Sequence, residues 1–225
     1  MSTIIPPAIA AIAPDGNLTP RQKRRFLIDM SLRKQKPGTG SSIEFLRRTT
    51  ADIEWPDLRN VLSGIRWVIV GTVATRAYMP ERMTQGLDIL VHEDEGEIVV
   101  ERLKVAGYTL LSKLAVPGCL LCSPDGVEVK VLFGDQLWLD AAFDQLECDA
   151  AGYPVLSLPY LVLMKLLAPR TKDWADVPRM LGLASDAQLE QVGKAIDRYS
   201  PEDRDDLDAL IFLGKKEMQV ADAEG

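Results

Sequence analysis

Several features that would assign this 225-residue sequence to a particular class of protein are missing. Its cysteine count is odd, with only Cys119, Cys122 and Cys148, which argues against a disulfide framework and favours a reducing cytoplasm. No apolar run is long enough to span a bilayer, so no membrane association is expected. The apolar start follows no basic residue, which argues against a secretory signal. With 47% hydrophobic and 26% charged residues, the chain is predicted to be globular and cytoplasmic.

Common nucleotide and metal motifs are also absent. The segment Gly71-Thr72-Val73-Ala74 lacks the glycines and lysine of a P-loop and the spacing of a dinucleotide fingerprint. No Asp-x-Asp-x-Asp-Gly run indicates a calcium loop. The single Cys119-x-x-Cys122 pair lies in a strand-like apolar run, which favours core packing over zinc binding. The one histidine, His92, is interpreted as the solvated end of a strand.

Charge is distributed unevenly along the chain. The net charge is −7, yet residues 1–50 hold nine Lys and Arg against three acids, a net +6 that leaves −13 for the rest. A basic arm of this kind can bind RNA or an acidic partner. The alternative is a solvated helix face that docks on the chain's own acidic body. Only two aromatic residues, Phe26 and Phe45, lie among these charges, and this small number of candidates for base stacking favours that alternative.

Hydrophobic periodicity predicts strands in the middle of the chain and helices on both sides. Strands are expected at Trp67–Val70, Leu87–Val91, Tyr108–Leu111, Cys119–Cys122, Val127–Phe133 and Tyr153–Leu156, with the first, second and fifth as neighbours. Helices are expected at Pro20–Lys36 (capped by Thr19), Ile43–Arg48, Trp55–Ser63, Thr72–Met79, Glu97–Ala106, Pro159–Leu167, Asp173–Leu181, Asp186–Arg198 and Pro201–Glu217. We divide the chain into an N-terminal tail and basic arm (1–63), an α/β core (64–158) and a helical C-terminal region (159–225).

Several motifs in the middle of the chain share the order found in one family. Val70–Ala74 places a glycine and a hydroxyl between a strand and a helix, and Arg82–Val91 leads into the next strand. Gly126–Leu132 follows an Asp-Gly turn, and Lys165 precedes Arg170-Thr171-Lys172-Asp173-Trp174-Ala175-Asp176. Together these motifs resemble the nucleotidyltransferases of type IV toxin–antitoxin and abortive-infection (AbiE-type) systems. The resemblance implies an α/β (α+β) fold, a nucleotidyltransferase-like mixed sheet with flanking helices and a helical C-terminal region.

The resemblance also implies a metal site whose acids this chain has partly lost. Family members carry Asp-x-Asp on one strand and a third Asp on a later strand. Nucleotidyl transfer uses such clusters to hold divalent cations, and residues i and i+2 of a strand share a face. Here the first acid is replaced by Gly86, the second is Asp88, and the third position holds Lys130 or, in a shifted register, Glu128.

Carried over residue by residue, the resemblance makes Asp88 and Glu128 catalytic candidates, with Asp88 as a Mg²⁺ ligand only if the protein is active. The candidates for substrate binding are Gly71, Thr72, Arg82, Thr84, Lys130, Lys165, Asp173 and Asp176. Lys130 is expected to pair with Asp88, with Glu128 alongside, so that the cluster is neutralised without a metal. The alternative is that the Lys130 side chain extends from the face of the sheet to solvent.

Three classes of function are compatible with the resemblance and remain open at this point. The first is a catalytically impaired protein that binds a nucleotide such as an NTP, or a toxin or antitoxin partner. The second is an active metal-dependent nucleotidyltransferase that transfers NMP from NTP to RNA or protein. The third is a structural interaction module.

Overall fold

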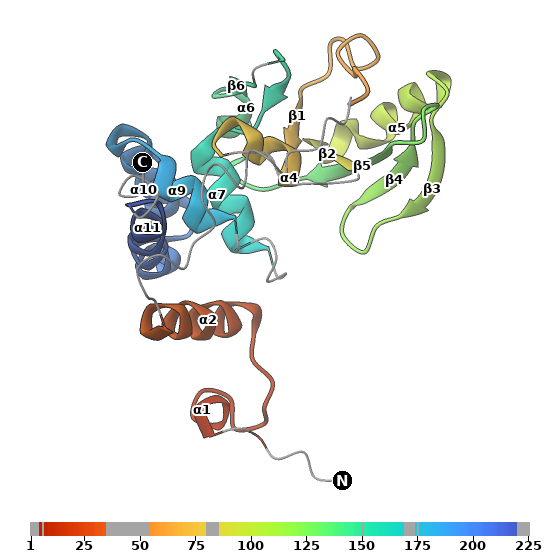
Figure 1. Ribbon diagram of the computed structural model, residues 1–225. Coiled ribbons are helices and arrows are strands. Elements are labelled where there is room, and N and C mark those ends of the chain that lie inside the picture. Colours follow the sequence, from red (N-terminus) through yellow and green to blue (C-terminus); the bar gives the residue numbers. More distant parts are fainter. Residues whose placement is uncertain are drawn as a thin grey trace.

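A mixed seven-stranded sheet forms the centre of the computed structural model, which describes residues 5, 7–34, 55–79, 86–149, 151–168, 174 and 176–219 (Figure 1). The strands are β1 Trp67–Val70, β2 Gly86–His92, β3 Thr109–Lys113, β4 Gly118–Cys122, β5 Glu128–Gly134, β6 Glu147–Cys148 and β7 Pro154–Val155. Their order across the sheet is β3-β4-β5-β2-β1-β7-β6. The predicted neighbours β1, β2 and β5 are therefore confirmed, with β2 between the other two.

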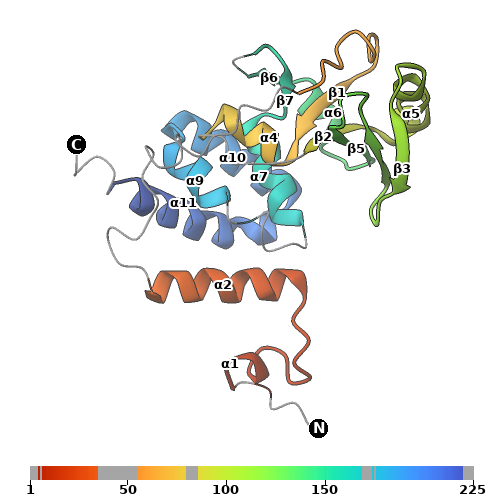
Figure 2. The same ribbon diagram turned by 45° about the vertical axis from the view of Figure 1, so that its right-hand side comes forward.

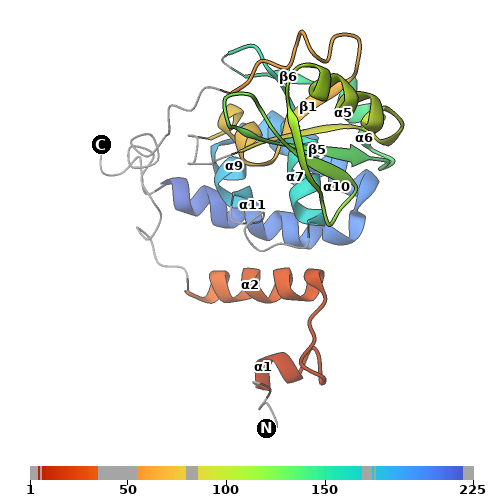
Figure 3. The same cartoon turned by 90° about the vertical axis from the view of Figure 1, so that its right-hand side faces the viewer.

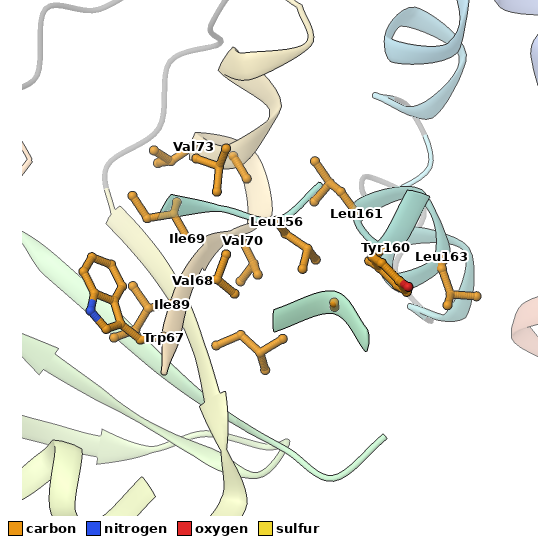
Figure 4. Packing of buried hydrophobic residues seen from close by; sticks show 14 of the residues in the cluster. Trp67, Val68, Ile69, Val70, Val73, Ile89, Leu156, Tyr160, Leu161 and Leu163 are labelled. Atoms are coloured by element: carbon orange, nitrogen blue, oxygen red, sulfur yellow. The ribbon is translucent and has the colours of Figure 1, made fainter. Parts of the chain in front are cut away.

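The pairing of the central strands explains their sequences. Strand β1 is antiparallel to β2 and parallel to β7, and all four of its residues are buried. Such a strand reads as a continuous apolar run, since both faces of the sheet are covered. Figure 4 shows the side chains of β1 close to Ile89 of β2 and to Leu156 and Leu161. Strand β2 is parallel to β5, and helix α5 (Gly96–Val105) lies in the connection between them.

Helices follow the sheet from residue 158 onward, as the sequence predicts. They are α7 Leu158–Leu167, α9 Val177–Leu183, α10 Asp186–Tyr199 and α11 Arg204–Gln219, with the 3-10 helix η3 Pro201–Asp203 before the last. Helices α9 and α11 cross closely at Gly182 and Gly214, where a Cβ on Gly214 would lie 1.9 Å from the carbonyl oxygen of Pro178. The predicted α/β architecture, a mixed sheet with flanking helices and a helical C-terminal region, is confirmed.

The N-terminal helix α2 (Pro20–Lys34) lies beside α11, on the side away from the sheet, and α1 (Pro7–Ala10) lies farther out (Figures 2 and 3). Thr19 and Gln22 form a capping box at the start of α2. The Gln22 N–H donates to the Thr19 hydroxyl, and the Thr19 N–H donates to the Gln22 side chain. Arginines of α2 pair with acids of η3 and α11. For these residues, the predicted docking of the basic arm on the acidic body is confirmed.

Some predicted elements are wrong. Trp55–Ser63 forms turns rather than a helix, because the Asp57 side chain accepts the Arg59 N–H in a local turn. In place of the helix expected at Thr72–Met79, the structure has two short elements. The α-helix α4 (Gly71–Ala74) is followed directly by the 3-10 helix η1 (Thr75–Ala77). Helix α6 (Leu139–Phe143), the 3-10 helix η2 (Glu93–Glu95) and β6 were not predicted, because they are too short for a periodic pattern. Ile43–Arg48 lies outside the described residues.

The helices were also compared with the dimensions of a bilayer. None of those in the described part of the chain is both long enough and apolar enough to cross a membrane.

Candidate functional site

Asp88 lies where three strands meet in register. On β2 it is opposite Val70, the last residue of β1, and beside Lys130 of β5. The Lys130 Nζ donates to the Asp88 Oδ1 at 3.1 Å. The Lys130 side chain is 37% exposed and that of Asp88 is 24% exposed, so the pair is in contact with solvent. The expected pairing of Lys130 with Asp88 is therefore present in the structure.

Gly71 lies against the other carboxylate oxygen of Asp88, Oδ2. Its φ of +68° lies in the left-handed region, which residues other than glycine rarely adopt. A Cβ at this position would lie 2.5 Å from the Asp88 Oδ2, which is a severe overlap. Glycine is thus required twice at the end of β1, for the turn into α4 and for the approach of Asp88. Thr72 follows directly and is partly exposed.

The two remaining positions of the expected acid cluster supply no further ligand. Gly86 pairs with Glu128 across β2 and β5, and a Cβ on Gly86 would lie 3.1 Å from the Glu128 carbonyl oxygen. Glu128 is exposed and, in the described part of the chain, forms no ion pair with Lys130. The expected participation of Glu128 in the pair is therefore wrong, because its side chain turns to solvent at the start of the strand.

These residues do not fit the magnesium site that the resemblance implies. Mg²⁺ is held by carboxylate and phosphate oxygens. Within the described residues, no three or more His, Cys, Asp or Glu side chains lie close enough to hold a metal ion. The one carboxylate at the centre, Asp88, already accepts a hydrogen bond from an ammonium group.

Lys165 and Asp176 form a second pair. The Lys165 Nζ lies 3.2 Å from the Asp176 Oδ2, and the two side chains are only 5% and 3% exposed. Trp174 lies between them in sequence and donates from its indole N–H to the Ala168 carbonyl at 3.0 Å. Burial on this scale leaves little room for direct contact with a substrate in this conformation. Arg82, Thr84 and Asp173, the other predicted substrate-binding residues, lie outside the described residues.

Two anchors of the segment after Thr72 were missed by the sequence analysis. Arg76 donates to the buried carboxylate of Asp149, whose other oxygen accepts the N–H groups of Ala151 and Tyr153. The Tyr78 hydroxyl donates to the Leu156 carbonyl at 2.9 Å. Burial, and then the nearby Glu147 carboxylate, raises the pKa of Tyr78. No local pattern marks these residues, because each partner lies far away in the sequence.

The other candidates considered from sequence do not join the site. His92 is four residues beyond Asp88 on β2, about 13 Å away at the rise of a strand. Its Nε2 lies 3.2 Å from an oxygen of Asp140. Cys119 and Cys122 are free thiols on β4, where Cys119 is buried. Core packing, rather than zinc binding, remains their interpretation.

Comparisons with known proteins were made on sequence and on structure. No protein-family model and no curated protein matches the chain. A solved Thermotoga maritima protein, provisionally described as a nucleotidyltransferase, is 16% identical, with 48% of this chain and 80% of that chain covered and a TM-score of 0.39. Terminal uridylyl transferase 4 from Trypanosoma brucei, solved with bound GTP, is 14% identical, with 88% and 70% covered and a TM-score of 0.28. At such TM-scores neither similarity carries weight, and the function must be inferred from this chain's own contacts.

Proposed function

We propose that this chain is a nucleotidyltransferase-like protein that does not perform metal-dependent transfer and acts by binding a nucleotide or a partner protein. One observation carries the proposal: the Lys130 ammonium lies 3.1 Å from Asp88, where the resemblance expects a metal shared by two acids. The positions of β1 and β5 on either side of β2 support the proposal, because they bring Gly71 and Lys130 to Asp88.

Electrostatics explains why this arrangement disfavours a metal. A divalent cation placed beside Asp88 would be attracted by one negative charge and repelled by one positive charge at a similar distance. The two effects are of similar size and largely cancel, so the pair offers no net charge to recruit the ion. Gly86 contributes no side chain, and the exposed Glu128 forms no ion pair with Lys130 among the described residues.

A transfer assay tests the loss of catalysis. The purified chain would be incubated with each labelled NTP and Mg²⁺ or Mn²⁺, with RNA or protein acceptors. We expect no metal-dependent label on either acceptor. Label transfer that Asp88→Ala abolishes, and that the control Lys113→Ala on β3 leaves unchanged, would contradict the proposal.

Calorimetry separates the two kinds of binding. Titration with NTP in the presence and absence of Mg²⁺ would show whether a nucleotide binds at all. If heat is released and is lost in Thr72→Ala, the nucleotide-binding form of the proposal is supported. No binding at millimolar NTP would eliminate this form and leave partner binding, such as a toxin–antitoxin-like complex, which co-purification with the product of the adjacent gene would test.

A further inference from the structure

A cluster of ion pairs lies in the interface between α2 and the C-terminal helices. Arg21, Arg24 and Arg25, at positions i, i+3 and i+4 of α2, form what we call the arginine face. Opposite lie the carboxylates of η3 and the first turn of α11, which we call the acidic shelf. The shelf consists of Asp203, Asp205 and Asp206.

Arg24 is at the centre of this interface. It is 3% exposed, and its Nε donates to the Asp206 Oδ2 at 2.8 Å while its terminal nitrogens donate to Asp203 and to the Leu166 carbonyl. Its guanidinium also lies 5.9 Å from the centre of the Trp174 ring. Two carboxylates, one carbonyl and one aromatic ring thus surround a single planar cation, the environment that suits arginine rather than lysine.

The arginines on either side complete the contact at its rim. The Nε of Arg21 lies 3.0 Å from Asp203, and Arg25 lies 3.0 Å from Asp205 and 3.6 Å from Asp206. Both arginine side chains are about half exposed. A helix with arginines at this spacing therefore matches the shelf through side chains on one face.

The apolar side chains of α2 are buried to different degrees. Ile28 is the one fully buried apolar residue among its described side chains, and Phe26, Leu27 and Met30 are half-buried. Arg21 and Arg24 of α2 contact Asp203, and Arg24 contacts Asp206, so the departure of α2 would open these carboxylates to water on the side that it occupies. Asp203 would also keep the hydrogen bond from the Ser200 hydroxyl.

We propose that the acidic shelf binds a helix of a partner protein with arginines at positions i, i+3 and i+4. In the free protein α2 occupies the shelf, and the partner's helix displaces it. Charge complementarity identifies the partner: its helix must present a guanidinium to Asp203, Asp206 and the Leu166 carbonyl at once. None of Gly71, Asp88 and Lys130 takes part, so this inference is independent of the function proposed above.

A competition experiment on the full chain tests the inference. A fluorescent peptide of residues 19–34 would be titrated, by anisotropy, into the wild-type chain and into the variant Arg21→Gln, Arg24→Gln, Arg25→Gln. We expect the variant to bind the peptide at least about tenfold more tightly, because the tethered α2 competes in the wild type. A peptide with the same three Gln substitutions should bind neither chain.

Hydrogen exchange and one further variant control for unfolding. In the triple variant, amides of α2 should lose protection while those of β1, β2 and β5 keep it. Adding Asp203→Asn and Asp206→Asn should abolish peptide binding. Equal affinity for wild type and triple variant, no binding to a triple variant whose α2 is unprotected, or full protection of α2 without its arginines would each overturn the inference.

Discussion

Two lysine–aspartate pairs of nearly equal length lie in different surroundings. Lys130 and Asp88 are 3.1 Å apart with side chains 37% and 24% exposed, whereas Lys165 and Asp176 are 3.2 Å apart and 5% and 3% exposed. The distance is the same to within 0.1 Å, so burial distinguishes them. Water can replace either partner of the exposed pair, whereas the two charged groups of the buried pair are shielded from water that could take the place of a lost partner.

This difference in burial suggests different roles for the two pairs, one in folding and one in ligand binding. The buried pair links α7 to the start of α9, so its disruption should affect folding first. The solvent-exposed pair lies beside the Gly71 turn, where a change should alter ligand binding more than stability. Substitutions in both regions test these two roles. They are given in order of decreasing expected effect on stability.

Breaking the buried pair should have the largest effect. Lys165→Met removes the ammonium group from a contact that is buried on both sides, and we expect a loss of about 3–5 kcal/mol in the free energy of unfolding. Urea denaturation followed by circular dichroism measures it. The control Lys194→Met removes an exposed pair with Glu190 and should cost less than about 0.5 kcal/mol. Equal losses in the two variants would show that burial does not distinguish the pairs.

Crowding of Gly71 against Asp88 should give the next effect. Gly71→Ala meets both a left-handed φ and the Asp88 carboxylate, so we expect a loss of about 1–3 kcal/mol from backbone strain alone, and more from the overlap. Gly126→Ala is the matched control, with φ of +85° and open space around its Cβ. The excess over this control should shrink when Asp88→Ala is added. An unchanged excess would mean that Asp88 does not crowd this position.

Tyr78 makes the stability depend on pH in the alkaline range. Its raised pKa means that the folded state holds the phenolic proton more tightly than the unfolded state, so unfolding releases the proton above pH about 10. The stabilisation is therefore complete below that pH and decreases as the pH rises further. Tyr78→Phe should cost about 1 kcal/mol at neutral pH through the lost bond to Leu156, and should flatten the alkaline decrease. The free energy of unfolding would be measured against pH for the wild type and Tyr78→Phe. The same decrease in both proteins above pH about 10 would contradict the burial of this hydroxyl.

Replacing the exposed lysine should change stability least. Lys130→Met is expected to shift the free energy of unfolding by less than about 1 kcal/mol, because solvent screens the pair that it removes. Thermal and urea unfolding measure this shift. A loss as large as that of Lys165→Met would place Lys130 among the structural residues.

Part of this arrangement could be predicted from sequence. A short apolar run and a run of alternating apolar residues, on either side of a strong turn at Asp125-Gly126, marked β4 and β5, and the family resemblance implied that Lys130 lies beside Asp88. Strand pairing explains the success, because residues in register on neighbouring strands are close whatever their side chains. The spacing of Trp55, Leu58 and Leu62 misled the prediction of a helix, since these buried residues are held by turns.

The burial of charged groups could not be predicted. Lys165, Asp176, Arg24 and Asp149 look like surface residues in the sequence, and each is buried by elements distant along the chain. Charged residues are rarely buried unless paired, and the partner is fixed only by tertiary packing. The same limit applies to the Arg76 anchor, whose partner Asp149 is 73 residues away.

Mn²⁺ binding measured by electron paramagnetic resonance tests most directly whether Lys130 takes the place of a metal at Asp88. The wild type, Gly86→Asp, Lys130→Asp and the double variant would be titrated side by side. We expect specific Mn²⁺ binding only in the double variant, lost again when Asp88→Asn is added, although the Glu128 carbonyl must move slightly to admit a side chain at position 86. Specific Mn²⁺ binding by the wild-type chain that Asp88→Asn abolishes and Lys130→Asp leaves unchanged would contradict the account.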